Sequence, residues 1–430
     1  MMTYHRWPFM PTNTQTPEQQ QQWWQDCFVS TPEVTRFVQA EASAVLVGGA
    51  GSGKSTAVAA LYDQLDEPAL LIPYPPHHWP GGSRPWIPGG SHLSQILAAA
   101  ATEVTRQLSE RPELFTAVTK LDTRQEFLNW LVEQHLGRRA LVRLYQRLRK
   151  LTPSLSFPEP SIDLYTTTAG EADTWNLLDE LIDLIQTLGY PRTLLILDLN
   201  EAEADVQLDD LGKLLGWLDL FEYPEFAVRA AIPTKVAKQL NILQSENGRL
   251  PVIRLQNNEA AITQVVGRHL QVATDGVCHS LEEVAGTAVL QRAQSEIEKL
   301  YGAQTVAGWL QWAETLLMLS AQQVPVDNPE TVAYHFYQRH IPLRLETVRS
   351  GAWRGPKFIP LNQQPYELLK KLFDLRGQPN PELLQEIAGS PANLNTLVSR
   401  LREEIEPLNG QYIYLHNRRD RGYWLENFLL

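Results

Sequence analysis

One short segment near residue 50 limits what this chain can fold into more than any other feature. It runs from Gly48 to Thr56 as GGAGSGKST and fits the pattern G-x-x-x-x-G-K-[ST]. The apolar residues 44–47 before it predict a strand, and the apolar residues 57–61 after it predict a helix. A strand, loop and helix of this kind turn several backbone N–H groups toward one point, where phosphate oxygens bind. The alternative is a glycine-rich turn that fits the pattern by chance.

The polar residues of this loop each have an expected role. Lys54 would reach the β- and γ-phosphates, and the Ser55 hydroxyl would bind Mg²⁺, which prefers oxygen ligands. Thr56 is expected to cap and pack. The residues predicted to bind the nucleotide are Gly48, Gly49, Ala50, Gly51, Ser52, Gly53, Lys54, Ser55 and Thr56. The predicted cofactors are therefore ATP and Mg²⁺.

The second part of such a site is expected at the end of the apolar segment 192–198. An apolar run that ends in an acid is typical of a buried parallel strand whose carboxyl end carries a carboxylate toward the phosphate loop. Asp198 would hold Mg²⁺ through water, and Glu201 is the candidate that polarises the attacking water. A core strand followed by an ordinary acidic turn is the alternative. Leu199 stands where an adjacent acid is usual, so nucleotide binding is predicted more directly than hydrolysis.

Further signals extend the pattern along the chain. Residues 69–73, 226–234 and 252–255 predict strands, and residues 259–270 predict a helix. Thr234 either lies near the γ-phosphate or caps the helix from Lys235 to Leu240. Strands that alternate with helices, with a phosphate loop after the first strand, predict an α/β fold with a doubly wound parallel sheet.

Residues 74–90 are rich in Pro, Gly and Trp and predict a long surface loop, whereas residues 91–150 show helical periodicity. The adjacent His77 and His78 have no nearby partner in the sequence, and we interpret them as loop residues rather than metal ligands. In residues 1–40, the Thr31-Pro32-Glu33 sequence predicts the start of a helix.

Composition narrows the class of protein. A length of 430 residues predicts two or three domains, and two cysteines far apart in sequence suit a reducing cytosol. We find no apolar run of membrane-span length and no secretory signal, so we expect a cytoplasmic protein without a membrane partner. The net charge of −12 argues against nonspecific coating of nucleic acid by the whole molecule. Residues 351–430, however, contain 10 Lys or Arg against 9 Asp or Glu.

Residues 28–345 resemble the AAA+ and STAND group of P-loop NTPases. The features that carry the resemblance are the loop at 48–55, the acid pair Asp198-x-x-Glu201, the apolar strand that ends at Pro233, and Leu255 followed by a helix through Gly267-Arg268-His269-Leu270. In that group an arginine near the lid often senses the γ-phosphate, which implies this role for Arg268. An exposed arginine that favours the helix dipole is the other interpretation. The catalytic residues implied are Lys54, Asp198, Glu201 and Arg268.

The pattern changes from Lys357 onward. Residues 357–361 predict a strand, followed by helices at 365–373, 381–387 and 393–406 and by a hairpin of 411–415 and 422–425. Three helices closed by a β-hairpin are typical of a winged helix-turn-helix. The expected fold class is therefore α/β, with the parallel sheet of a P-loop NTPase, a helical lid and a C-terminal winged helix-turn-helix domain.

This tail resembles the OmpR/PhoB-type winged helix. The residues that carry the resemblance are Leu361, Glu367-Leu368-Leu369, Leu397-Val398-Ser399-Arg400-Leu401-Arg402 and Arg421-Gly422-Tyr423-Trp424-Leu425. In that family the third helix enters the major groove of DNA and the wing contacts phosphates or the minor groove. The resemblance implies DNA contacts by Asn395, Thr396, Ser399, Arg400 and Arg402 of the third helix and by Arg418, Arg419 and Arg421 of the wing. Because Glu403, Glu404 and Glu406 repel phosphate, docking on a protein, or an autoinhibitory role, is the alternative.

We expect the following domain organisation: an N-terminal helical segment at 1–40, a P-loop NTPase core at 41–257 with insertions at 74–90 and 91–150, a helical lid at 258–345, a linker at 346–356, and a winged helix at 357–430. The function expected is that of a bacterial-type ATPase switch whose nucleotide state is coupled to DNA binding, as in a regulator, loader, mobile-element or defence-type ATPase. The alternative is a nucleotide-stabilised, weakly or non-hydrolysing assembly module whose winged helix docks a protein partner. The number of subunits is left open, a homo-oligomer included.

Overall fold

The computed structural model describes residues 8–9, 17–80, 90–151, 171–200, 208–217, 220, 223–242, 250–256, 258–380, 382, 386–387, 389–418 and 422–429. The chain divides into two compact units. Unit 1 contains Met1–Val29, Ala50–Ser52 and Asn257–Leu430, and unit 2 contains Ser30–Gly49 and Gly53–Gln256. Glu201, a predicted site residue, lies outside the described part of the chain.

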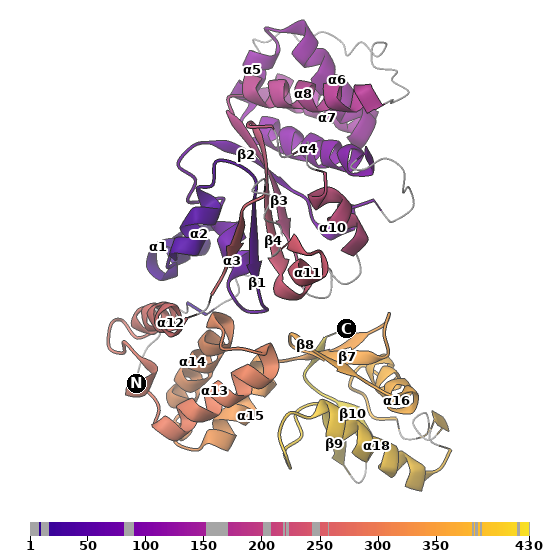
Figure 1. Cartoon of the computed structure of the whole chain (residues 1–430). Coiled ribbons are helices and arrows are strands. Elements are labelled where there is room, and N and C mark those ends of the chain that lie inside the picture. The colour runs from indigo at the N-terminus through magenta and orange to yellow at the C-terminus, as the bar shows by residue number, and fades with distance from the viewer. Residues whose placement is uncertain are drawn as a thin grey trace. The chain divides into compact units, whose positions relative to one another are not determined.

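A five-stranded parallel sheet forms the centre of unit 2 (Figure 1). Its strands are β1 (Ala44–Gly48), β2 (Ala69–Pro73), β3 (Arg192–Asp198), β4 (Phe226–Pro233) and β5 (Val252–Arg254). Their order is β2-β3-β4-β1-β5, and each neighbouring pair is parallel. All residues of β1 and β4 are buried, which explains why their sequences are almost continuously apolar. The predicted strands and the α/β fold class are therefore confirmed.

Four helices directly precede or follow the strands of this sheet along the chain: α2 (Pro32–Val38), α3 (Lys54–Ala60), α10 (Leu208–Leu215) and α11 (Thr234–Gln239). Helix α2 starts as predicted, because the Thr31 side chain caps it by accepting a hydrogen bond from the Val34 amide and Pro32 takes the first helical position. One face of this helix is buried and contains Phe37 and Val38.

A helical bundle is inserted between β2 and β3. Its long helices are α4 (Gly90–Glu110), α6 (Asp122–Leu136), α7 (Arg138–Leu151) and α8 (Glu171–Thr187), with the short elements η2 (Pro76–His78), η3 (Pro112–Leu114) and α5 (Phe115–Val118). Figure 1 shows these helices gathered in one group. Helix α8 has no counterpart among the elements predicted from the sequence.

The segment after β2 differs in part from the predicted surface loop. Tyr74 is fully buried and Trp79 is 6% exposed. The Tyr74 hydroxyl bonds to His92 Nδ1 at 2.9 Å, and the indole of Trp79 donates to the Tyr74 carbonyl at 3.1 Å. These aromatic side chains bury enough area to hold the backbone near the sheet despite its prolines. Residues 81–89 lie outside the described part.

The helical part of unit 1 contains α1 (Pro17–Cys27), α12 (Glu259–Ala273), η6 (Leu281–Glu283), α13 (Thr287–Tyr301), α14 (Val306–Ala321) and α15 (Pro329–His340). Three of these helices begin at side-chain caps, supplied by Asn258, Thr305 and Asn328. None of the described helices is long and apolar enough to cross a membrane.

The end of the chain contains β6 (Leu343–Glu346), β7 (Gly351–Arg354), β8 (Lys357–Pro360), α16 (Gln363–Asp374), α18 (Pro391–Ile405), β9 (Leu415–Arg418), β10 (Gly422–Leu425) and β11 (Phe428–Leu429). One sheet has the order β11-β6-β7-β8, and β9 pairs with β10 as an antiparallel hairpin. Of the second predicted helix, only Glu382, Glu386 and Ile387 are described, and all three are helical.

Two predictions about this part are corrected. Strands β6 and β7 occupy residues for which the sequence predicted the end of the lid and a linker. They pair with each other, and β7 pairs with the adjacent β8, as local antiparallel hairpins; only β11, the second partner of β6, lies far along the chain. The first strand of the hairpin starts at Leu415 rather than at Gln411. The Glu406 carboxylate accepts hydrogen bonds from the amides of Ile413, Tyr414 and Leu415, which removes these donors from a strand ladder.

Candidate functional site

The loop between β1 and α3 has the backbone geometry that its glycines predict. Gly51 has a φ of +69° and Gly53 has a φ of +96°, a region that side chains with a Cβ rarely adopt. A Cβ at Gly53 would meet no atom within 4 Å, so the backbone angle alone requires glycine there. Gly53 is the N-cap of α3 and offers no side chain to its first amides. These amides are therefore available to an anion.

Lys54 is held inside this loop. Its side chain is buried, with 7% of the residue exposed. The ammonium donates to the carbonyl of Gly48 at 3.0 Å and to the carbonyl of Gly49 at 2.8 Å. A buried cation at the base of a glycine-rich loop offers a site for phosphate charge.

Strand pairing brings the predicted carboxylate to the same edge. Gly48 at the end of β1 pairs with Pro233 of β4, and Asp198 at the end of β3 pairs with Ala231 of β4. The Ser55 hydroxyl donates a hydrogen bond to the Asp198 carboxylate. Burial raises the pKa of Asp198, whereas the bond from Ser55 and the charge of Lys54 act in the opposite direction.

These groups fit a magnesium ion. A hydroxyl and a carboxylate in direct contact are both oxygen ligands, and Mg²⁺ at a nucleotide takes few ligands from the protein. Within the described ranges, no group of three or more His, Cys, Asp or Glu side chains is placed to hold a metal ion, and this covers His77 and His78. The remaining ligands of Mg²⁺ would thus be water and phosphate.

Thr234 lies next to this edge because it directly follows Pro233, the partner of Gly48. The structure corrects one of its two predicted roles. Helix α11 begins at Thr234 itself, and Pro233 takes the N-cap position, so Thr234 is not the cap. Pro233 has a φ of −64° and a ψ of 144°, the extended conformation of an N-cap residue, and the helical angles begin at Thr234. A role of Thr234 near the γ-phosphate stays a prediction.

Arg268 is exposed on α12, and its Nε donates to the backbone carbonyl of Asp26 in α1. Its neighbour His269 is buried and contacts the rings of Phe9 and Trp23. Burial lowers the pKa of His269 to about 4, so the ring is neutral at pH 7. In unit 1, Arg268 thus joins α12 to α1; a role in sensing phosphate stays a prediction.

The tip of the phosphate loop, Ala50–Ser52, belongs to unit 1 together with α13 and α14. The Ala307 amide donates to the Gly51 carbonyl at 3.1 Å. A Cβ on Gly51 would come within 2.8 Å of Cε1 of Tyr301 and 3.1 Å of the Thr305 hydroxyl. The sequence analysis did not assign Tyr301, Thr305 or Ala307 to the site; the only local signal was the capping residue Thr305 before α14.

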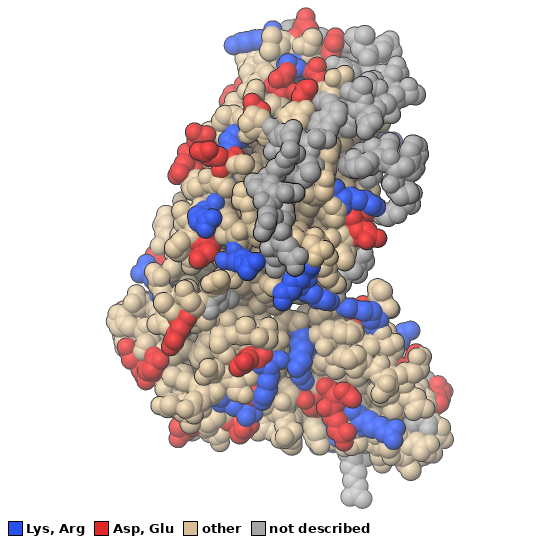
Figure 2. Space-filling view, viewed as in Figure 1, with Lys and Arg blue, Asp and Glu red and all other residues tan. Residues whose placement is uncertain are grey.

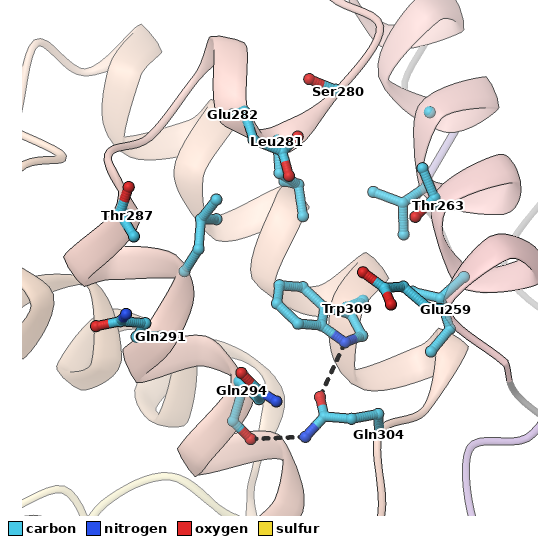
Figure 3. Close-up of a pocket in the computed structure, with 14 residues that line it drawn as sticks. Glu259, Thr263, Ser280, Leu281, Glu282, Thr287, Gln291, Gln294, Gln304 and Trp309 are labelled. Carbon is cyan, nitrogen blue, oxygen red and sulfur yellow. Dashed lines mark hydrogen bonds between the residues drawn. The ribbon is translucent and has the colours of Figure 1, made fainter.

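A separate cavity of ≈ 410 Å³ lies in unit 1 between α12, η6 and α13. Figure 3 shows Glu259 and Thr263 on one side and Gln291 and Gln294 on the opposite side. The indole of Trp309 donates to Gln304 at 3.0 Å at its base. No residue predicted to act in the site lines this cavity.

The residues predicted to contact DNA lie on α18 and on the hairpin. Asn395, Thr396, Ser399 and Arg400 are exposed on α18, and Arg418 is exposed on β9. Arg419 and Arg421 lie outside the described residues. Leu397, Val398 and Leu401 are buried, as the sequence predicted.

Arg402 has a different environment from its neighbour Arg400. Its Nε and Nη2 donate to the Leu415 carbonyl at 3.1 and 2.9 Å, and its guanidinium lies 3.8 Å from the ring centroid of Tyr412. Arg402 therefore joins α18 to the hairpin. Of the three predicted phosphate-repelling acids, Glu403 and Glu404 are exposed, whereas Glu406 is turned to the backbone of 413–415.

The chain matches no protein-family model and no curated protein sequence. Among solved structures it is similar to the ORC2 protein of Aeropyrum pernix, described as ADPNP-ADP complexes. The TM-score is 0.34 and the identity is 9%, and the match covers 93% of this chain and 88% of that chain.

Proposed function

We propose that this chain binds ATP and Mg²⁺ at the loop of residues 48–56 and acts as an AAA+-type, nucleotide-dependent switch. The observation that carries the proposal is the contact of Ser55 with Asp198 beside the buried Lys54. A cation, a hydroxyl and a carboxylate meet at the carboxyl edge of a parallel sheet, where such sheets bind nucleotides. The first strand of the sheet leads into the phosphate loop, and a group of helices follows the sheet along the chain. This order of elements supports an AAA+-type ATPase.

Each residue has a defined task in this proposal. Lys54 exchanges its loop carbonyl partners for phosphate oxygens, and Ser55 and Asp198 hold Mg²⁺. Bound Mg²⁺ would neutralise phosphate charge. Glu201, three residues after Asp198, orients the attacking water. Hydrolysis is the part of the proposal that depends on Glu201.

The tip of the loop offers a route from nucleotide to lid. Phosphate binding would order the amides of this loop. The carbonyl of Gly51 belongs to the same loop and accepts a hydrogen bond from the Ala307 amide. Nucleotide binding would thus change the start of α14, and hydrolysis or exchange would reverse that change. Hydrogen exchange at the Ala307 amide should slow or accelerate on addition of MgATP; an unchanged rate would contradict this route.

For the winged helix we propose contact with double-stranded DNA through Asn395, Thr396, Ser399, Arg400 and Arg418. Arg402 positions the hairpin in this proposal rather than touching DNA, because its guanidinium is engaged by Leu415 and Tyr412. The exposed Glu403 and Glu404 favour a second candidate function, docking on a protein partner. Arg400→Gln with Arg418→Gln should weaken duplex binding at low salt under the first function and leave it unchanged under the second.

The direct test is binding of ATP by the full chain with and without Mg²⁺. Lys54→Ala should abolish binding, Asp198→Asn should remove its Mg²⁺ dependence, and Glu201→Gln should retain bound ATP while stopping turnover. Wild-type protein that binds no ATP at millimolar concentration would overturn the proposal. Turnover that is unchanged in Glu201→Gln would remove Glu201 from its assigned role and leave binding intact.

A further inference from the structure

Helix α7 has an outer face of a single charge sign. Within Arg138–Leu151, six residues are basic and none is acidic, in a chain of net charge −12. The basic residues are all exposed: Arg138, Arg139, Arg143, Arg147, Arg149 and Lys150. On the face of the molecule in Figure 2, by contrast, acidic and basic side chains are interspersed. The charge of α7 is therefore local and needs an explanation.

The other face of α7 belongs to the core of the bundle. Leu141, Leu144, Tyr145 and Leu148 are between 0 and 5% exposed. The Tyr145 hydroxyl also donates to Asn129 Oδ1 at 2.7 Å, which joins α7 to α6. The apolar face is thus occupied, so α7 is not available to insert into a lipid surface.

Helix stability does not explain these charges. Arg138 and Arg139 lie at the N-terminal end, where the helix dipole disfavours cations. Arg139, Arg143 and Arg147 follow each other at four-residue intervals, and like charges at this spacing destabilise a helix. Only Arg149 and Lys150 lie in the last turn, where the helix dipole favours a cation.

Four acids of the bundle are engaged with arginines of helices other than α7. Arg106 pairs with Glu103 and Glu110 on α4, and Arg124 pairs with Glu180 and Asp183 on α8. In the described part of the chain, Arg138, Arg139, Arg143, Arg147 and Lys150 form no ion pair. The charge of these five side chains is therefore not balanced by ion pairs within the described residues.

We infer that α7 is a second DNA-binding surface, which contacts the phosphate backbone independently of the winged helix. A four-residue step advances about 6 Å along a helix, so Arg139, Arg143 and Arg147 present guanidinium groups at regular intervals. Duplex DNA carries one negative charge about every 1.7 Å along its axis, so each group can reach a separate phosphate. The planar guanidinium also forms paired hydrogen bonds with phosphate oxygens.

The test measures affinity of the full chain for a fluorescent duplex over a range of salt concentrations. The triple variant Arg139→Gln, Arg143→Gln and Arg147→Gln should reduce the slope of log K against log salt by about 2 to 3, because each phosphate that an arginine neutralises adds about 0.9 to that slope. The matched control removes the same charge from three separate exposed positions of unit 2, Arg36→Gln, Lys120→Gln and Lys238→Gln, and should keep the wild-type slope.

Further variants separate this inference from the function of the winged helix. Arg400→Gln with Arg418→Gln should leave residual binding that the α7 changes then remove. If the wing pair lowers the slope and the α7 triple does not, the inference is overturned and the winged helix is still a DNA-binding domain. Binding of polyglutamate by α7 with an unchanged DNA slope would overturn it in favour of an acidic protein partner.

Because glutamine is a good helix former and like-charge repulsion is relieved, the triple α7 variant should have a melting temperature no lower than that of the wild type. A lower melting temperature with an unchanged DNA slope would show that the arginines stabilise the fold instead.

Discussion

The Ser55 hydroxyl donates a hydrogen bond to the Asp198 carboxylate, although the two residues belong to distant parts of the chain. Ser55 lies in the first turn of α3, and Asp198 is the last residue of β3, which is separated from β1 by β4. The contact depends on parallel pairing that ends all three strands at one edge. It joins the phosphate loop to the predicted carboxylate ligand, and the first prediction tests its electrostatic consequence.

We expect Asp198→Asn to raise the melting temperature at pH 7 while it weakens Mg²⁺-dependent ATP binding. Burial raises the pKa of Asp198 above 3.8, so ionisation of this carboxyl costs stability in the folded state. The cost is absent below the unfolded pKa and grows as pH rises through the folded pKa. The advantage of the variant should therefore disappear near pH 3. Thermal melts at both pH values check this, and a variant less stable than wild type at pH 7 would contradict it.

The glycines of the loop offer a matched pair. Gly49→Ala and Gly53→Ala both place a Cβ where no atom lies within 4 Å, but only Gly53 has a positive φ. We expect Gly53→Ala to lower stability by about 1 kcal/mol or more and to weaken ATP binding at least tenfold, because the loop must leave its left-handed conformation. Gly49→Ala should change stability by less than about 0.5 kcal/mol. Equal effects of the two substitutions on stability would show that backbone angle is not the constraint.

Arg229 should be a strong determinant of stability in unit 2. It has no exposed surface, and it donates to the carbonyls of Ala40 and Ala42, which precede β1. Burial, with the nearby charge of Arg192, lowers the pKa of Arg229 to about 10. Arg229→Met leaves these carbonyls without their donor and should reduce the free energy of unfolding by about 2–4 kcal/mol. Arg254→Met, at an exposed position of β5, is the control and should change it by less than about 0.5 kcal/mol in a urea titration.

Two arginines of α18 should differ in their effects. Arg402→Ala removes two hydrogen bonds to the Leu415 carbonyl and a contact with Tyr412, so we expect a loss of about 1–2 kcal/mol in stability. Arg400→Ala removes an exposed side chain and should keep the stability while it lowers the salt slope of DNA binding by about 0.9. Melting and fluorescence anisotropy on both variants provide the comparison. A stable Arg402→Ala protein with a reduced slope would place Arg402 on the DNA instead.

The winged part shows where local patterns were insufficient. The hydrophobic periodicity of α16 and α18 predicted both helices and the burial of Leu397, Val398 and Leu401. The sequence could not show that Arg402 faces the hairpin while Arg400 faces solvent, nor that Glu406 binds the amides of 413–415. These partners come from another element, and helical spacing alone does not specify them. Strands β6 and β7 were not predicted either, although their pairing with each other and with β8 is local; only the pairing of β6 with β11 joins distant residues.

The sequence by itself determined the phosphate loop, the five strands of the parallel sheet and the start of a helix at Thr31, because backbone angles, capping and apolar runs are local properties. Only the tertiary structure decided that Ser55 meets Asp198, that the Ala307 amide binds the Gly51 carbonyl, and that Arg402 of α18 bonds to the Leu415 carbonyl. The physical reason is that strand order and helix docking minimise exposed apolar area over the whole unit. Contacts made in this way join residues whose separation in the chain carries no signal of the pairing.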